Sequence, residues 1–168
     1  MAGRFNVKQR HRQRGAKRGF TLVEILIVVV ILGILAAITI PMFTDAANGA
    51  RQTVFVTDVR EFAKAAHLYR VETGEYLEDS SSGTLPAGWA PYVDENKWTQ
   101  PTPIGGVWDM ELNSFSITQA LGVHFDGTGQ TRDDAYMLEI DRAFDDNNLA
   151  TGAFREIADN QRYYYVLR

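Results

Sequence analysis

The chain has 168 residues, no cysteine and a formal net charge of -4 at pH 7. This length leaves room for one modest domain and argues against a multidomain enzyme. Without cysteine there is no disulfide, no thiol nucleophile and no Cys-ligated metal site. The charge is also divided unevenly. Residues 1–19 hold seven Lys or Arg and no acid, which leaves ten bases against 21 acids in residues 20–168.

An apolar stretch follows the basic segment. Residues 25–42 contain a single polar side chain, Thr39. A helix of this length spans about 27 Å, close to the ~30 Å hydrocarbon core of a bilayer. The excess of bases before the stretch predicts an N-terminus in the cytoplasm and export of the acidic remainder. We therefore expect a single-pass membrane protein whose C-terminal part is exported.

Glu24 lies at the start of this apolar stretch, where a carboxylate is costly. One interpretation is that its side chain reaches the lipid headgroups. A cleaved secretory signal ending at Ala36-Ala37 does not account for an acid in its apolar core. A twin-arginine signal would need more than Lys17-Arg18. An uncleaved signal anchor fits the hydropathy but gives Glu24 no role.

The segment Gly19-Phe20-Thr21-Leu22-Val23-Glu24, with the apolar run after it, resembles the N-terminus of type IV pilins and type II secretion pseudopilins. The resemblance implies that a membrane peptidase cuts between Gly19 and Phe20, and that Phe20 is then N-methylated. Cleavage would create a positive amino group that needs a partner, and Glu24 is the only acid near it. A pair within one subunit is open on the residues alone. The resemblance implies a pair with the neighbouring subunit.

Gly33 and Pro41 both lie in the apolar stretch. Gly lowers helix stability by about 1 kcal/mol and Pro by ~3 kcal/mol, although membrane helices tolerate both. A mild kink at Pro41 is the simpler interpretation. Their positions also resemble those of pilins in which this part of the helix melts on assembly. We therefore predict a hinge from Gly33 to Pro41.

An amphipathic helix should continue the membrane segment over residues 44–74. Five apolar side chains recur at steps of three and four: Phe55, Val59, Phe62, Ala66 and Tyr69. Gly74 is the expected helix end. Tyr69, Gly74 and Tyr76 also resemble the helix exit of secretion pseudopilins, although Leu77 stands where that motif has proline.

Residues 75–168 should form a small globular domain with antiparallel strands. A long loop is predicted over residues 78–106, with Trp89 and Trp98 anchoring it to the core. A hairpin should turn near Asn113-Ser114, a helix should be capped by Thr131 through Asp134, and strands are expected near 153–157 and 162–167. The predicted class is α+β and pilin-like, in four segments: 1–19, 20–43, 44–74 and 75–168.

No motif indicates catalysis, since the three histidines have no catalytic or metal-binding partner in the sequence. Oxygen-bearing side chains cluster late in the chain at Asp141, Asp145, Asp146, Asn147 and Asn148. A solvated turn is the simpler interpretation because a regular calcium-loop spacing is missing. Some pseudopilins bind calcium in a late loop, so calcium stays an alternative. We otherwise expect no cofactor and no enzymatic activity.

The resemblance implies a structural subunit of a type II secretion pseudopilus, anchored in the inner membrane with its C-terminal domain in the periplasm. Its partners would be copies of itself, related pseudopilins, prepilin peptidase, an inner-membrane assembly platform and membrane lipid. The alternatives are a major or minor type IV pilin and a membrane-anchored monomeric binding or sensor domain. Nucleic acid is not expected as a partner, because the basic tail adjoins a membrane segment. A pilin that takes up DNA would need an exposed basic patch on its acidic globular part.

Overall fold

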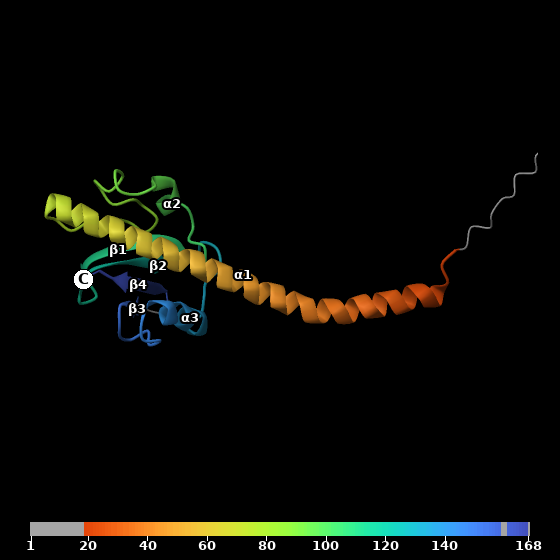
Figure 1. Ribbon diagram of the computed structural model, residues 1–168. Coiled ribbons are helices and arrows are strands. Elements are labelled where there is room, and N and C mark those ends of the chain that lie inside the picture. Colours follow the sequence, from red (N-terminus) through yellow and green to blue (C-terminus); the bar gives the residue numbers. More distant parts are fainter. Residues whose placement is uncertain (1–18, 159–160, 168) are drawn as a thin grey trace, which may run out of the picture. The chain divides into compact units, whose positions relative to one another are not determined.

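The structure, a computed structural model, describes residues 19–158 and 161–167 (Figure 1). Its elements follow the order α1, α2, β1, β2, α3, β3, β4. The chain divides into two compact units, Met1–Met42 and Phe43–Arg168, which we describe separately. Of the predicted leader, residues 1–19, only Gly19 lies within the described part. One long N-terminal helix and a small antiparallel sheet confirm the predicted α+β class.

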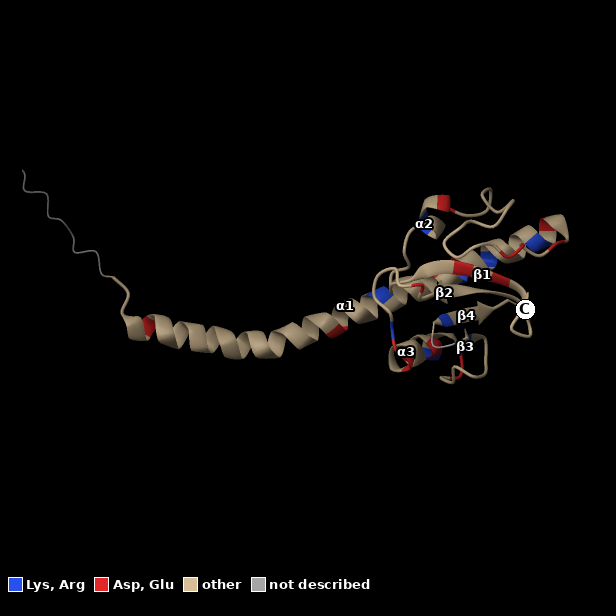
Figure 2. Cartoon of the chain, turned by 180° about the vertical axis from the view of Figure 1, so that it is seen from behind, with Lys and Arg blue, Asp and Glu red and all other residues tan. Residues whose placement is uncertain are grey.

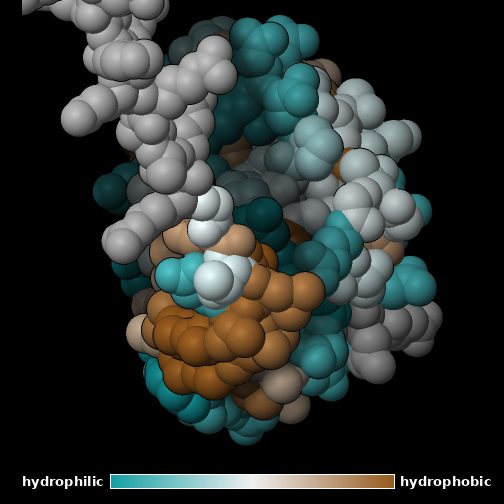
Figure 3. All heavy atoms as spheres, turned by 90° about the vertical axis from the view of Figure 1, so that its right-hand side faces the viewer, coloured by the Kyte–Doolittle hydropathy of each residue, from teal (hydrophilic) through white to brown (hydrophobic). Residues whose placement is uncertain are grey.

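Helix α1, Leu22–Thr73, is 52 residues long and belongs to both units. In the first unit its side chains are uncovered, and its most apolar 18-residue window has a mean hydropathy of 3.0 with no residue buried. Figure 3 shows the brown surface that such apolar side chains form. This part of the helix is long and apolar enough to cross a membrane.

In the second unit four antiparallel strands form one sheet in the order β1-β2-β4-β3. The strands are β1 (Val107–Ser114), β2 (Ile117–His124), β3 (Phe154–Ala158) and β4 (Arg162–Val166). Strand β2 pairs with both β1 and β4, so it is an inner strand, as is β4. The strands expected near 153–157 and 162–167 are therefore confirmed as β3 and β4.

The β1–β2 hairpin turns later than predicted. Ser114 pairs with Ile117, which places the turn at Phe115 and Ser116 rather than at Asn113-Ser114. Both turn residues have positive φ, 50° and 61°. Two-residue hairpin turns of this kind match the twist of the strands they join, even where the residues themselves do not favour positive φ. Strand pairing between Ser114 and Ile117 therefore determines where the hairpin turns, and the turn preference of Asn113 does not.

The core of the second unit lies between α1 and one face of the sheet. The predicted stripe is confirmed at Phe55, Val59, Phe62 and Ala66, which are buried. The Phe55 ring stacks on Trp108 of β1 with centroids 5.3 Å apart, and Phe62 meets the same indole edge-on at 4.9 Å. These aromatic contacts fix the second part of α1 on the sheet.

The loop that precedes the sheet contains a short helix that the sequence analysis missed. Helix α2, Glu95–Thr99, is capped by Asp94, whose side chain accepts a hydrogen bond from the Asn96 amide at 3.0 Å. It presents Trp98 to the core, where the indole N–H donates to the Thr84 carbonyl at 2.9 Å. Trp89 is also buried, so the predicted anchoring of this loop by tryptophan is confirmed.

Helix α3, Asp134–Phe144, begins differently from the prediction. Its N-cap is Asp133, which accepts a hydrogen bond from the Tyr136 amide at 3.0 Å, so the expected Thr131 cap is wrong. Asp134 instead accepts a hydrogen bond from the Tyr163 hydroxyl of β4 at 2.5 Å. A contact made only after folding therefore engages the carboxylate that the predicted capping box would have used.

The other face of the sheet carries a polar network. Tyr164 of β4 is fully buried and donates its hydroxyl to Asp109 of β1 at 2.5 Å. The ring reaches across the intervening strand because Gly122 has no side chain, and a Cβ there would lie 2.6 Å from Tyr164 Cδ1. Arg162 forms ion pairs with Asp109, at 3.0 Å, and with Glu111. Burial, with the charges of Asp109 and Asp79, raises the pKa of Glu111.

Candidate functional site

The start of α1 is a capping box built from Thr21 and Glu24. The Glu24 carboxylate accepts hydrogen bonds from the Thr21 amide at 2.7 Å and from its hydroxyl at 2.8 Å. In return, the Glu24 amide donates to the Thr21 hydroxyl at 3.2 Å. The spacing Thr21-x-x-Glu24 satisfies helix donors that would otherwise have no partner. The costly carboxylate therefore has a local structural role that the sequence analysis did not recognise.

Gly19 and Phe20 precede this cap and lie outside any regular element. Both are exposed: Phe20 has 83 % of its surface open, and a Cβ added to Gly19 would meet no described atom within 4 Å beyond its chain neighbours. The residues on both sides of this peptide bond are therefore exposed in the described part of the chain. An amino group created at Phe20 would lie one residue before Thr21 and about one helical turn before Glu24. The structure thus places the three predicted residues in one short segment.

Gly33 and Pro41, the predicted hinge residues, both lie within α1. A Cβ added to Gly33 would meet no described atom within 4 Å beyond its chain neighbours and the nearby backbone of its own helix. Pro41 has no amide hydrogen, so it cannot donate to the carbonyl four residues earlier. Between them the Thr39 hydroxyl donates to the Leu35 carbonyl at 2.6 Å, a contact that often accompanies bending of a helix. The hinge itself stays a prediction, because both residues lie in helical structure here.

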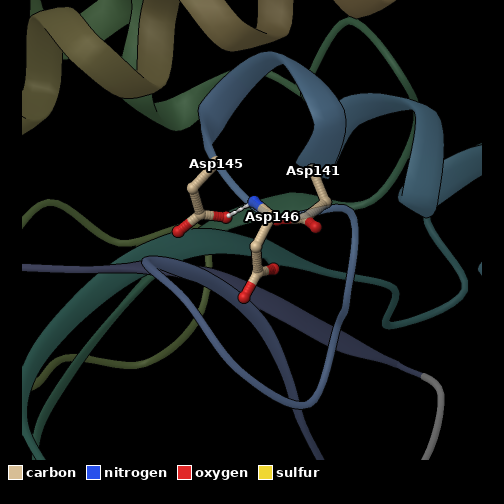
Figure 4. Close-up of side chains that lie close together, drawn as sticks. All are labelled: Asp141, Asp145 and Asp146. Atoms are coloured by element: carbon tan, nitrogen blue, oxygen red, sulfur yellow. Dashed lines mark hydrogen bonds between the residues drawn. The ribbon is translucent and has the colours of Figure 1, made fainter.

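Three carboxylates meet where α3 ends (Figure 4). One oxygen from each of Asp141, Asp145 and Asp146 lies within 4.8 Å of the others. Asp141 is fully buried and the other two are exposed. The sequence had shown the acids as neighbours. The burial of one of them could not be seen before the fold was known.

Asp141 is the carboxylate of this cluster whose charged form is least favourable, because it is buried. Its Oδ2 accepts a hydrogen bond from the Asn148 amide at 2.6 Å, while its Oδ1 is buried and accepts no hydrogen bond from the described residues. Burial raises the pKa of Asp141 to about 6, with further contributions from Asp145 and Asp146. A cation that bound all three carboxylates would relieve both the unmet oxygen and the mutual repulsion.

The backbone of the following loop is held around the same acids. Asp145 accepts hydrogen bonds from the amides of Asp146, at 2.8 Å, and of Ala153. Asp146 accepts from the Thr151 hydroxyl at 2.7 Å. Gly152 has a φ of 78°, and a Cβ there would lie 2.4 Å from the Asp145 carboxylate. The loop is therefore closely fitted to the acidic side chains.

A hollow of about 440 Å³ opens beside the polar network, lined by residues 79–82, Asp109, Glu111 and Arg162. In it the Ser82 hydroxyl lies 2.8 Å from His124 Nδ1, and the Asp109 carboxylate lies 3.9 Å from the same nitrogen. A Ser-His-Asp relay needs the two partners on opposite ring nitrogens. Burial lowers the pKa of His124 and so disfavours its protonated, charged form. This group is therefore not arranged as a hydrolase triad.

Comparison with known proteins finds similarity in the N-terminal part of the chain. A family model described as "Prokaryotic N-terminal methylation motif" matches residues 11–40. Type II secretion system core protein G of Pseudomonas aeruginosa is 42% identical over 64 residues, which is 38% of this chain and 45% of that protein. Its namesake in Vibrio cholerae is 40% identical over 58 residues, 34% of this chain and 40% of that protein.

Pilins appear among the relatives as well. The type IV wide pilus major component PilA4 of Thermus thermophilus is 36% identical over 69 residues, 41% of this chain and 52% of that protein. The chain thus spans about half the length of the curated relatives it matches. No solved structure matches the chain. The family model covers the capped start of α1 and most of its apolar stretch.

Proposed function

We propose that this chain, which belongs to the pilin and pseudopilin family, is a structural subunit of a type II secretion pseudopilus. One observation carries the proposal: an uncovered apolar helix begins two residues after the exposed pair Gly19-Phe20 and carries the carboxylate of Glu24 in its first turn. The matching relatives support it, since several are type II secretion system core protein G. The family's members are structural subunits, so no catalytic step is assigned to this chain.

The apolar part of α1 gives the mechanism of assembly. In the inner membrane, lipid covers this surface. In a filament, the same surface packs against the helices of neighbouring subunits, so the helix leaves the bilayer without exposing apolar side chains to water. The second unit, with its acidic charge, remains on the periplasmic side. The basic residues 1–18 hold the N-terminus in the cytoplasm until prepilin peptidase removes the leader.

Glu24 sets the position of each subunit. Once the leader is removed, Phe20 carries a positive amino group in apolar surroundings, where an unpaired charge is unfavourable. Glu24 of a neighbouring subunit supplies the partner, and this pairing fixes the axial register of the filament. The capping contacts to Thr21 hold the same carboxylate before assembly. Glu24 therefore exchanges an internal partner for an external one when the subunit joins.

A type IV pilus subunit is the second candidate function. The type IV pilus component PilA4 of Thermus thermophilus and a fimbrial protein of Pseudomonas aeruginosa are among the matching relatives. The fimbrial protein is 39% identical over 66 residues, 39% of this chain and 43% of that protein. Both functions use the same helix, so the assembly mechanism is common to them. The appearance of surface pili, rather than dependence on a secretion system, would distinguish the second from the first.

A calcium ion at Asp141, Asp145 and Asp146 is part of the same proposal. The buried Oδ1 of Asp141 accepts no hydrogen bond from the described residues, and this supports a cation rather than the solvated turn that the sequence suggested. Carboxylate oxygens are the ligands that calcium prefers, and the exposed Asp145 and Asp146 leave the site open to water ligands. The ion would tie the end of α3 to the loop before β3, so its role is to stabilise the second unit.

Two substitutions at Glu24 test the assembly mechanism in cells that carry the secretion system. Glu24→Gln keeps an oxygen that can accept from Thr21 but removes the charge, whereas Glu24→Ala removes both. We expect both variants to be processed at Gly19 and both to be missing from sheared filaments. Filaments of normal yield from Glu24→Gln would refute the charge pairing. Wild-type protein that is processed but never polymerises would instead indicate a membrane-anchored monomer.

A further inference from the structure

A groove of about 550 Å³ runs along the last part of α1 in the second unit. One wall is formed by α1 and the other by the end of β4 and the residues after it. The groove is lined by Arg60, Ala63, Lys64, Ala66, His67, Arg70, Gln119, Ala153, Tyr165, Val166 and Leu167. Its floor is largely apolar, and its rim on α1 is basic. The proposed assembly through the apolar helix leaves this groove without a function.

The basic side chains of the groove occur at Arg60, Lys64, His67 and Arg70. Their steps of four, three and three place them on one face of the helix, over a length of about 15 Å. Blue segments mark this part of α1 in Figure 2. Within the described part of the chain, none of the four forms an ion pair with a carboxylate. Glu61, the nearest acid in sequence, is held by Lys97 of α2 at 2.6 Å.

Two of the bases are held in place by uncharged contacts. The Arg60 guanidinium lies 5.4 Å from the centre of the Phe144 ring and donates to the Ala143 carbonyl at 2.6 Å. The Arg70 guanidinium lies 4.1 Å from the centre of the Tyr76 ring. Such contacts orient a guanidinium without neutralising it. The rim is therefore positioned in advance for an anionic partner, while Lys64 and His67 remain exposed between the two arginines.

The charge of the chain itself indicates what that partner is. Residues 20–168 carry 21 acids and ten bases, and three of those ten lie in this groove. The groove is thus a local basic feature on an acidic chain, and every copy presents acidic surface complementary to it. An extended segment of about four or five residues matches its length. Acidic side chains on such a segment would meet the rim, and apolar ones the floor.

We propose that the groove binds an acidic surface segment of a second copy of this chain, as a lateral contact between globular units in the filament. The proposal rests on the proposed function. Because the basic groove and the acidic surface are different patches, the contact is heterologous and repeats from copy to copy. Heterologous contacts that do not close produce helical filaments rather than dimers. The groove thus adds a specific polar contact to the non-directional packing of the apolar helices.

The direct test places a photoreactive amino acid at Lys64 in the full chain, in cells that assemble filaments. Two copies of the chain with different affinity tags are expressed together. The expected product is an adduct that carries both tags, with the cross-linked peptide containing Asp or Glu. Adducts only with another protein, or no adduct when filaments are present, would overturn the proposal. Absence of filaments from the unmodified chain would count against the proposed function as well, so the two failures are distinguishable.

A charge reversal measures how much the contact contributes. Lys64→Glu should lower filament yield about tenfold or more, because like charges across an interface disfavour association. Lys64 is exposed, so the variant should unfold at the same temperature as the wild type. Arg51→Glu makes the same charge change on an exposed position of the same helix outside the groove, and should change yield less than about twofold. Equal yields from the two variants would overturn the proposal.

Discussion

Asp141 offers a prediction whose size follows from the structure. Replacing it with Asn keeps an oxygen for the Asn148 amide but removes the buried charge. The pKa of Asp141 is raised from 3.8 to about 6. The folded state therefore binds more protons than the unfolded chain between these values. The stability associated with the neutral carboxyl is present at low pH and is lost as pH rises through about 6.

The shift of about two pKa units corresponds to at most ~3 kcal/mol, since each unit is worth ~1.4 kcal/mol. Water around the exposed Asp145 and Asp146 screens part of this unfavourable interaction, which leaves a destabilisation of about 1–2 kcal/mol. In a chelator at about pH 7.5, Asp141→Asn should therefore raise the midpoint of thermal unfolding by several degrees, and near pH 4 by much less. Added calcium at about 1 mM should stabilise the wild type and have little effect on the variant.

Tryptophan fluorescence in detergent is a suitable assay for this comparison. The three tryptophans, Trp89, Trp98 and Trp108, are all buried in the second unit, so the signal reports that unit and not the membrane segment. A variant that is less stable than the wild type to the same degree at both pH values would refute the argument, because it would show that the Asp141 charge is not the destabilising feature. Equal responses of the two proteins to calcium would exclude Asp141 as a ligand.

Two further predictions concern the second unit. Phe62→Ala should lower the free energy of unfolding by about 3–5 kcal/mol in urea titrations. The reason is that its ring packs against those of Trp89, Trp98 and Trp108, with centroids 5.8, 5.0 and 4.9 Å away. The control Val54→Ala, at a position 49 % exposed, should change this free energy by less than about 0.5 kcal/mol. Arg162→Met leaves Asp109 and Glu111 without their cation, so the free energy of unfolding should fall by about 2 kcal/mol or more at neutral pH. The loss should be smaller near pH 4, because the raised pKa of Glu111 favours its neutral form there. A loss independent of pH would indicate that packing of the Arg162 side chain, rather than its charge, matters.

The sequence predicted best where periodicity and composition act directly. The apolar stripe from Phe55 to Ala66 faces the core as expected, and helix α1 ends at Thr73. Gly74 follows with a φ of 79°, and its amide donates to the Arg70 carbonyl at 2.9 Å. These features depend on residues within one helix and its cap. A pattern in one segment is sufficient to reveal them.

The features that were missed depend on segments distant in sequence. The short helix α2 lies within a proline-rich loop, where burial of the Trp98 indole in the core stabilises it. No pattern in residues 95–99 predicts that helix. The basic groove requires the end of β4 to lie beside Arg60 and Arg70, so a helix face that looked merely solvated became one wall of a site. The capping role of Glu24 is an exception, since Thr21-x-x-Glu24 was visible in the sequence. Its place at the start of an apolar stretch is what suggests a further, functional role for the same carboxylate.

The central claim is that Gly19-Phe20 is a processing site and that the remaining chain assembles through its N-terminal helix. The most direct measurement is the mass of the N-terminal peptide of the protein taken from sheared filaments. The account predicts a chain that begins at N-methylated Phe20 and lacks residues 1–19. An N-terminus at Met1 or Ala2, or any chain that still carries the basic segment within a filament, would contradict it.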